Sequence, residues 1–412
     1  MSKPLKIIFV SFISDVKHTT KGFVKKDLEK VDSLNNIDGV TCLGVSLSDE
    51  IENDYFYSDN FFVKKIPKSK NYKFFGSWFN NIAKHKILSD FLSDQDFDVV
   101  LFRYDIATRG LLKLTKRFKN KIIFEHNSFE YDELVLGIKT RRALLKFSFK
   151  PGFFLYYIEG KFWPLFSENY LGKKIRSNAL AGISVTNEIT KYQSSLCKNY
   201  KNVTITNGII YDNKLLHKPI KYDKSELKLF MLLGTGAPWH GVDRLMNGLA
   251  LYKGNLKITI DIIGYYNEQD KKLLQNLKID HLMSFINPLA GKNLDDKLNY
   301  YHMSIGTLAV HRKKLIEATP LKVRDSLMRG FPTIIGYSDT DLLIESDLDK
   351  YILKMPADDS SINFDKVENF ANSILNDMYH CSKISELSKP KIDYNIKASQ
   401  IVDFIKSSLI SQ

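Results

Sequence analysis

Residues 312–332 read RKKLIEATPLKVRDSLMRGFP and combine a predicted helix start with charged side chains on both sides of it. Thr319 is a favourable N-cap residue, Pro320 suits the first helical position, and Gly330 followed by Pro332 indicates the end of the helix. The first amides of a helix carry the positive end of its dipole, which stabilises an anion by about 0.3–1 kcal/mol. The stretch is therefore a candidate anion site.

Three charged residues of this stretch are placed to face one ligand. Glu317 precedes the predicted helix, and Lys322 and Asp325 are three residues apart, on the same side of it. The alternative is an amphipathic helix in which Leu321 and Met328 are buried and the charges are solvated. Periodicity alone does not separate the two interpretations.

Length and composition predict an α/β protein larger than one domain. The chain has 412 residues, of which 44% are hydrophobic, enough for two cores. Its 3 cysteines are far apart and lack metal-ligand spacing, so we expect neither a disulfide framework nor a metal site. No apolar run is long enough to span a bilayer, and the N-terminus does not resemble a signal peptide. We therefore expect a cytoplasmic protein.

Positive charge is concentrated in one part of the chain. The net charge is +13, and residues 101–200 hold 18 Lys and Arg against 8 Asp and Glu. Within them, segment 139–161 mixes cations with aromatic side chains, a pattern that suits an anionic surface at the inner face of the cell membrane. Its cations are Lys139, Arg141, Arg142, Lys146, Lys150 and Lys161. Nucleic acid is the competing partner, and a solvated lysine-rich surface is the third interpretation.

Short β-rich runs alternate with amphipathic stretches along the whole chain, which predicts parallel sheets built from βαβ units. Strands are expected at 5–12, 40–45, 99–103, 121–125, 181–185 and 203–206, and again at 229–233, 258–263, 284–286, 305–310 and 333–335. Helices are expected at 20–34, 75–92, 109–118, 141–175, 187–196, 242–252, 268–277, 294–301 and 320–329. The turn pair Asn207-Gly208 and the lysine-rich segment 211–226 indicate a linker between two doubly wound domains.

A glycine-containing loop follows the first predicted strand of the second half. It reads GTGAPWHG from Gly234 to Gly241, and its glycines let backbone amides approach a phosphate. It matches neither GxGxxG nor a P-loop. Open α/β sheets bind ligands at the carboxyl ends of their strands, and Glu317 also follows a predicted strand. Both segments are therefore candidates for one site.

Several ordered segments resemble the family 4 glycosyltransferases of the GT-B fold. Glu317 and Asp325 resemble the family's two glutamates separated by seven residues, and GTGAPWHGVDRL at 234–245 resembles the segment that opens its nucleotide-binding domain. The other similar segments are IIFEHNS at 122–128, ISVTNEIT at 183–190, ITNGI at 205–209 and DYNIKASQIVDFI at 393–405. The resemblance implies two Rossmann-like domains facing a central cleft, at 1–207 and 208–390, with a helix at 391–412 crossing back to the first.

The resemblance also implies roles for individual residues. Glu317 is expected to contact the donor sugar near the reacting carbon, Asp325 to accept hydrogen bonds from the ribose hydroxyls, and Lys322 to stabilise the diphosphate. The aspartate is one methylene shorter than the family's glutamate. The full set expected at the donor is Lys322, Asp325, Gly234, Gly236, His240, Thr319, Leu321 and Arg312.

Two further expectations concern a missing cation and a second catalytic residue. Many relatives have an arginine and a lysine after the first strand of the second domain, where this chain has Thr235 and His240. Arg312 or Lys313 is the candidate for the missing cation. His126 lies where the family often places a histidine near the donor sugar, and the alternative is a histidine satisfied by backbone groups at a strand end.

The implied activity is transfer of a hexose, with retention, from a UDP- or GDP-linked sugar to a saccharide or lipid-linked saccharide in surface polysaccharide assembly. We expect no cofactor and no metal, and we expect Asp358-Asp359 to belong to a helix cap. An epimerase of the same fold is the first alternative, with catalytic groups placed differently in the same nucleotide pocket. A nucleic-acid-binding protein that uses the basic region is the second.

Overall fold

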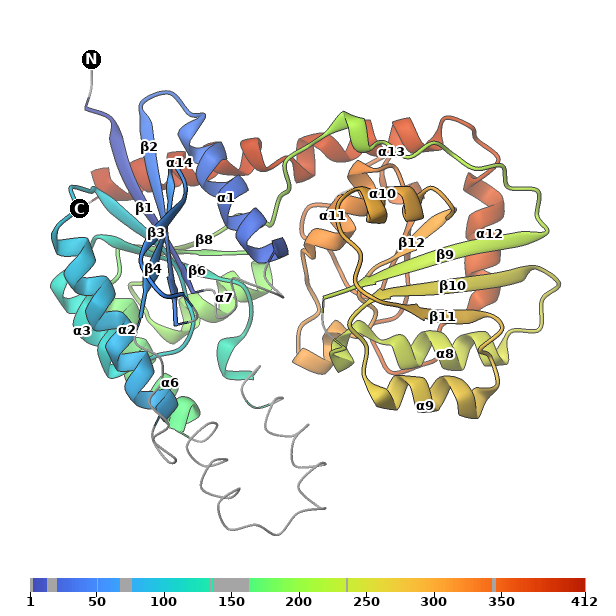
Figure 1. The fold of residues 1–412 in the computed structure, drawn as a ribbon, viewed down its shortest axis with the longest axis horizontal. Coiled ribbons are helices and arrows are strands. Elements are labelled where there is room, and N and C mark those ends of the chain that lie inside the picture. The colour runs from blue at the N-terminus through green and yellow to red at the C-terminus, as the bar shows by residue number, and fades with distance from the viewer. Residues whose placement is uncertain are drawn as a thin grey trace, which may run out of the picture. The chain divides into compact units, whose positions relative to one another are not determined.

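The computed structural model describes residues 3–12, 21–49, 51–66, 76–132, 135, 163–234, 236–342 and 346–411 (Figure 1). The chain divides into two compact units, Met1–Ile205 with Tyr394–Gln412, and Thr206–Asp393. The sequence predicts domain boundaries after residues 207 and 390. No helix in the described ranges has the length and apolar character needed to cross a membrane.

The first unit is built on a sheet of eight strands in the order β3-β4-β2-β1-β5-β6-β7-β8. The strands are β1 (Leu5–Phe12), β2 (Val40–Ser48), β3 (Tyr55–Ser58), β4 (Phe61–Lys65), β5 (Val99–Arg103), β6 (Ile122–His126), β7 (Ala181–Ser184) and β8 (Asn202–Thr204). Within this sheet the β3–β4 pair is antiparallel and the other described pairs are parallel. Central strands such as β1 are almost entirely buried, which explains their continuous apolar runs.

Helices cover both faces of this sheet. They are α1 (Lys21–Asn35), α2 (Gly76–Ser93), α3 (Arg109–Arg117), α6 (Trp163–Asn178), α7 (Asn187–Leu196) and α14 (Tyr394–Ile410). Helices α1 and α14 pack together on one face, and α2, α3 and α6 lie on the other (Figure 1). Thr108 and Thr186 cap α3 and α7 through their hydroxyl groups. The predicted helical region 141–175 is described only from residue 163 onward.

The sequence pattern does not predict the edge hairpin β3–β4. Strand β3 reads YFYS and is largely exposed, with Phe56 at 63% and Tyr57 at 50% of full exposure. It therefore lacks the alternation of buried and exposed side chains by which a strand is recognised. Strand β4 is anchored by Phe62, whose ring stacks on Phe91 of α2 with the centroids 5.8 Å apart.

The second unit has a six-stranded parallel sheet in the order β11-β10-β9-β12-β13-β14. The strands are β9 (Glu226–Leu233), β10 (Lys257–Gly264), β11 (Met283–Ile286), β12 (Met303–Ile305), β13 (Thr333–Ile335) and β14 (Ile352–Lys354). Counted within the unit, this is the Rossmann strand order. Such sheets bind ligands where the strand order reverses, which here is between the carboxyl ends of β9 and β12.

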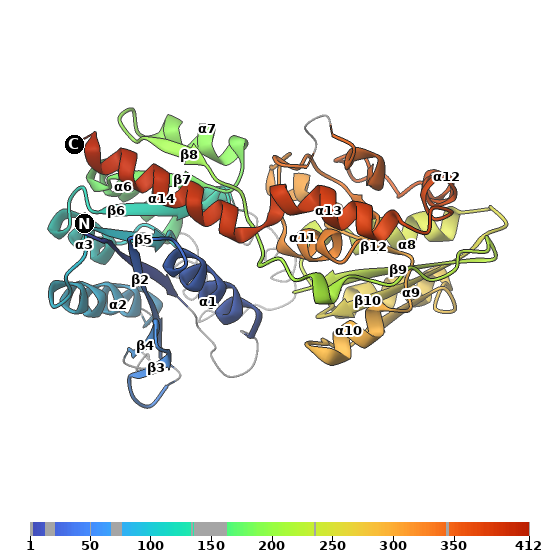
Figure 2. The same cartoon turned by 90° about the horizontal axis from the view of Figure 1, so that it is seen from above.

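The helices of the second unit also lie on both faces of their sheet. They are α8 (Val242–Leu251), α9 (Glu268–Leu277), α10 (Lys292–Leu298), α11 (Leu321–Met328), α12 (Phe364–Ile374) and α13 (His380–Ile392). Helices α8 and α9 pack together on one face, whereas α10 and α11 lie on the other (Figure 1). Helix α13 lies beside α11 in both views (Figure 1 and Figure 2). The sequence pattern does not predict α12, α13 or β14.

Helix α11 begins one residue later than the sequence predicts. Pro320 occupies the N-cap position and makes no side-chain cap, so the expected capping role of Thr319 is wrong. The predicted stop signal is confirmed. Gly330 has a φ of 85°, its amide donates to Leu327 O, and the amide of Phe331 donates to the carbonyl oxygen of residue 326, which together form a Schellman motif.

A buried ion pair holds α11 in the second unit. The Arg324 guanidinium donates to both carboxylate oxygens of Asp339, and the side chains of both residues have no exposed surface. Arg324 Nε also donates to Asn207 O at 3.0 Å. Removing one partner of such a pair leaves an uncompensated buried charge, which costs about 3–5 kcal/mol. The pair therefore fixes the helix that carries Lys322 and Asp325.

Candidate functional site

The candidate site lies in the second unit, where the strand order reverses between β9 and β12. The loop at 234–241 leaves β9 and is joined to the segment that leaves β12 by two backbone hydrogen bonds of 3.0 Å. These run from Leu308 N to His240 O and from Ala309 N to Trp239 O. Strand β12 therefore ends earlier than the sequence predicts, because the chain then turns to bond this loop.

Close approaches of neighbouring segments explain two glycines of the loop. Gly241 has a φ of 75°, and a Cβ atom there would lie 2.9 Å from Leu308 Cβ. A Cβ atom on Gly236 would lie 2.9 Å from the backbone nitrogen of Asn267, whose side-chain amide donates to Gly236 O at 3.1 Å. The loop is therefore held from both sides, by the segments that follow β10 and β12.

Lys322 projects from the first turn of α11 towards the end of β9. Its side chain is half-buried, and its Nζ atom donates to Leu232 O at 3.1 Å and lies 3.2 Å from the position that a Cβ atom on Gly234 would take. Burial lowers the pKa of Lys322 to about 8. No carboxylate in the described part of the chain pairs with this ammonium group. The structure thus brings together two residues of the predicted set, Lys322 and Gly234.

His240 lies in the same group of side chains. Burial, followed by the charges of Lys322 and Lys313, lowers the pKa of His240 to about 4. Lys313 Nζ lies 5.0 Å from the ring centroid of Trp239, the residue before His240. At neutral pH the imidazole is therefore uncharged, and it can exchange hydrogen bonds with a ligand without adding charge.

Glu317 lies in the segment between β12 and α11. The residues on either side of it bond Ser338, with Ala318 N donating to Ser338 O and Ser338 N donating to Ile316 O. Thr340 Oγ1 donates to Glu317 Oε2 at 3.3 Å, and the glutamate is half-buried. The backbone of this candidate catalytic residue is therefore fixed by a short parallel bridge.

The residues between Glu317 and Lys322 differ in how they are placed. Thr319 is buried, and its hydroxyl and carbonyl oxygens accept from the side-chain amide of Asn207 at 3.1 and 3.0 Å. Leu321 is half-buried at the start of α11. Both lie at the predicted anion site, but the hydroxyl of Thr319 bonds Asn207 rather than capping the helix.

Asp325 makes contacts separate from those of Lys322. Its Oδ2 atom accepts from Arg329 Nε at 2.9 Å, and Arg329 also pairs with Asp295 at 2.8 Å. The side chain of Asp325 keeps 29% of its exposure. A carboxylate has about four acceptor positions, so one bond to Arg329 leaves capacity for hydroxyl donors.

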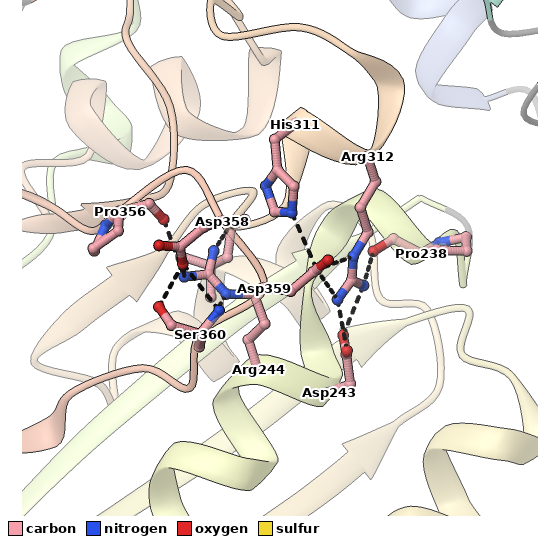
Figure 3. Close-up of polar contacts among 10 residues, drawn as sticks. Pro238, Asp243, Arg244, His311, Arg312, Pro356, Asp358, Asp359 and Ser360 are labelled. Carbon is pink, nitrogen blue, oxygen red and sulfur yellow. Dashed lines mark hydrogen bonds and ion pairs between the residues drawn. The ribbon is translucent and has the colours of Figure 1, made fainter.

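Arg312 is paired with two carboxylates (Figure 3). Its guanidinium donates to both oxygens of Asp243 at 2.9 and 2.7 Å, to Asp359 at 2.7 Å and to Pro238 O at 2.7 Å. Hydrogen bonding to Asp243 is the main cause that raises the pKa of Arg312. The charge of Arg312 is thus balanced by two carboxylates of the chain, and its expected role as the missing diphosphate cation stays a prediction.

The expected helix cap at Asp358 and Asp359 is wrong. Helix α12 is capped by Asn363, whose side chain accepts from the amide of residue 366. Asp358 instead contacts Arg244, and Asp359 contacts His311 as well as the guanidinium at position 312 (Figure 3). The two aspartates thus hold basic side chains of α8 and of the 3₁₀ helix at Val310–Lys313.

Sequence patterns miss the carboxylates that bind Arg312. Asp359 is 47 positions from Arg312 in the chain, and Asp243 is 69 positions away. No local spacing or periodicity relates residues at such separations. The resemblance to a family does not indicate them either, because it concerns ligand contacts rather than pairs within the chain.

His126 lies in the first unit, at the end of β6, and has no exposed surface. Its Nδ1 atom bonds Glu130 at 2.8 Å and its Nε2 atom bonds Tyr200 at 2.9 Å. Burial is the main cause that lowers the pKa of the imidazole. Both ring nitrogens thus contact side chains, and the expected contact of His126 with a donor sugar stays a prediction.

Two expectations fall on residues that are not described. The basic and aromatic segment 139–161 lies outside the described residues, and so does Thr235 of the loop after β9. Neither enters the site geometry given above.

No known protein-family model matches the chain, and no curated protein matches its sequence. Solved structures match it along nearly its whole length. Sucrose-phosphate synthase from Thermosynechococcus elongatus superposes with a TM-score of 0.65 at 12% identity, covering 99% of this chain and 100% of its own.

Two other solved structures are similar over the same length. The lipopolysaccharide outer core galactosyltransferase WaaB has a TM-score of 0.61 at 12% identity, with 98% of this chain and 99% of its own covered. Anabaena HepE in complex with UDP and glucose has a TM-score of 0.58 at 10% identity, with 98% and 100% covered. The fold of this chain is therefore that of the GT-B glycosyltransferases.

Proposed function

We propose that the chain is a retaining glycosyltransferase that moves a hexose from a UDP- or GDP-linked sugar to a saccharide or lipid-linked saccharide acceptor. One observation carries the proposal. The ammonium group of Lys322 lies beside Gly234 at the reversal of the strand order, and burial lowers its pKa without a carboxylate among the described residues to balance its charge. An anionic ligand would stabilise a desolvated cation in this position.

A nucleotide diphosphate sugar fits the groups around Lys322. The diphosphate is proposed to lie between the loop after β9 and the start of α11, where Lys322 Nζ and Gly234 are close together. Asp325, one turn further along α11, is proposed to accept from the ribose hydroxyls. Glu317, which precedes the helix, is proposed to face the donor sugar. The other residues proposed for the donor site are Gly236, His240, Thr319 and Leu321.

The proposed chemistry follows from the charges that develop in glycosyl transfer. The departing diphosphate gains negative charge, which Lys322 stabilises from its position at the end of β9. The sugar ring gains positive charge as the bond breaks, and the carboxylate of Glu317 stabilises it. In this proposal side chains, rather than a metal ion, balance the diphosphate. We further propose that the acceptor belongs to surface polysaccharide assembly, a role supported by the similarity of the fold to that of the lipopolysaccharide outer core galactosyltransferase WaaB.

Replacing Glu317 with glutamine tests the proposed catalytic carboxylate. Neutral glutamine cannot balance charge on the sugar, so we expect kcat to fall by about 100- to 1000-fold while the affinity for the nucleoside diphosphate stays within about twofold. Release of nucleoside diphosphate from the nucleotide sugar that best stabilises the wild type measures turnover. Glu386→Gln, an exposed change on α13, is the matched control. Turnover equal to the control would remove Glu317 from the mechanism.

Binding of UDP or GDP should take up a proton through Lys322. Without a ligand the pKa of this lysine is about 8, and a bound diphosphate stabilises the ammonium form and raises that pKa. Affinity should therefore fall as the pH rises above 8, and at pH 8.5 binding should take up roughly three-quarters of a proton. Calorimetry in two buffers of different ionisation enthalpy measures this uptake. Lys322→Met should abolish it, and an unchanged uptake in that variant would contradict the assignment.

We also propose that segment 139–161 binds an anionic membrane surface at the cytoplasmic face, on the strength of its cations and aromatic side chains. Each cation near such a surface contributes about 1 kcal/mol, so replacing Arg141, Arg142 and Lys146 with glutamine should weaken vesicle binding about a hundredfold. Flotation with anionic vesicles measures the binding. The matched control replaces three exposed lysines of the second unit, Lys253, Lys272 and Lys278, with glutamine. Equal losses in both variants would refute the segment's role.

A further inference from the structure

Basic side chains from three segments lie in or beside the loop that follows β9. Lys322 comes from α11, His240 from the loop after β9, and Lys313 from the 3₁₀ helix η4 (Val310–Lys313). Lys322 Nζ lies beside Gly234, and Lys313 Nζ lies 5.0 Å from the ring centroid of the residue before His240. After burial, the charges of both lysines also lower the pKa of His240. The two lysines therefore lie beside two residues of the same loop, Gly234 and Trp239.

The charges in this region are distributed unevenly. The guanidinium of Arg312 is balanced by Asp243 and Asp359, so it adds no net positive charge at the loop. The imidazole of His240 is neutral at neutral pH. Lys322 therefore supplies one charge, whereas a nucleoside diphosphate carries at least two negative charges at neutral pH. A second cation is needed, and η4 carries the other lysine of this group.

The backbone around Lys313 is held by the residues on either side of it. Arg312 donates to Pro238 O in the loop, and Asp243 holds the same guanidinium from the first turn of α8 (Figure 3). His311 contacts the carboxylate of residue 359 at 3.1 Å. The residue that follows η4 has a φ of 61°, which turns the chain away. The contacts of residues 311 and 312 thus hold the backbone of η4, which places Lys313 beside the loop.

We propose that Lys313 is the second cation that binds the diphosphate, a role that rests on the proposed function. The chain then carries both diphosphate cations on segments that follow β12, and the loop after β9 contributes amides and a neutral imidazole. This arrangement accounts for a loop that reads GTGAPWHG and contains no lysine or arginine. It also assigns Arg312 to holding η4 in place instead of to the ligand.

Binding of UDP and UMP, or GDP and GMP if the wild type prefers guanine, tests the assignment. Lys313→Ala should weaken the diphosphate about tenfold and the monophosphate by less than about twofold, because a charge-assisted contact to the second phosphate is lost. Lys313→Arg should restore most of the affinity. Lys314→Ala, one residue further along, is the matched control and should bind as the wild type does. Calorimetry at one fixed salt concentration measures these four proteins and Lys322→Met.

Two results would overturn the assignment of Lys313. One is diphosphate affinity in Lys313→Ala equal to that of Lys314→Ala, and the other is an equal loss for diphosphate and monophosphate. If the proposed function itself is wrong, the wild type will bind no nucleoside diphosphate at all, which distinguishes this failure from the other two results. If the wild type binds, Lys322→Met weakens diphosphate binding and Lys313→Ala does not, the proposed function stands and the role of Lys313 is wrong.

Discussion

The ion pair between Arg324 and Asp339 is the constraint on which the candidate site depends. Arg324 lies in the middle of α11, two residues after Lys322 and one before Asp325, so fixing it fixes both. The same helix is tied to the start of the second unit through Asn207. The carbonyl oxygen of Asn207 accepts from Arg324, and its side-chain amide donates to the segment that precedes α11. The helix that presents the proposed donor-binding residues therefore has little freedom to move within its unit.

Four cations on or near α11 divide into two kinds by their partners. Arg324, Arg312 and Arg329 each pair with two carboxylates, which gives them structural roles. Lys322 donates to a carbonyl oxygen and has a pKa lowered to about 8 by burial, so its charge is incompletely balanced. Burying a cation of the second kind costs folding free energy unless an anionic ligand balances its charge. This difference separates residues proposed to bind the donor from residues that hold the loops.

Local sequence patterns predict the parts of the fold that local contacts determine. Buried parallel strands such as β1, β5 and β13 are continuous apolar runs and match their predicted bounds, and Gly330 ends α11 as expected. The sequence predictions fail where contacts between residues distant in the chain determine the partner of a side chain. Thr319 has a hydroxyl that could cap the helix, but this hydroxyl accepts a hydrogen bond from the side-chain amide of Asn207. Local patterns also do not indicate the two distant carboxylates that bind Arg312, or the side chains that contact both ring nitrogens of His126.

Amide hydrogen exchange of the full chain, with and without saturating UDP or GDP, tests most directly whether the donor binds at the reversal of the strand order in the second unit. Amides that bond a diphosphate or lie beneath it open less often, so exchange should slow in residues 236–241 and 318–323. The last turns of α9 and α12, which lie away from this edge of the sheet, should exchange at unchanged rates. Binding that leaves both segments unchanged and protects other parts of the chain instead would contradict the account.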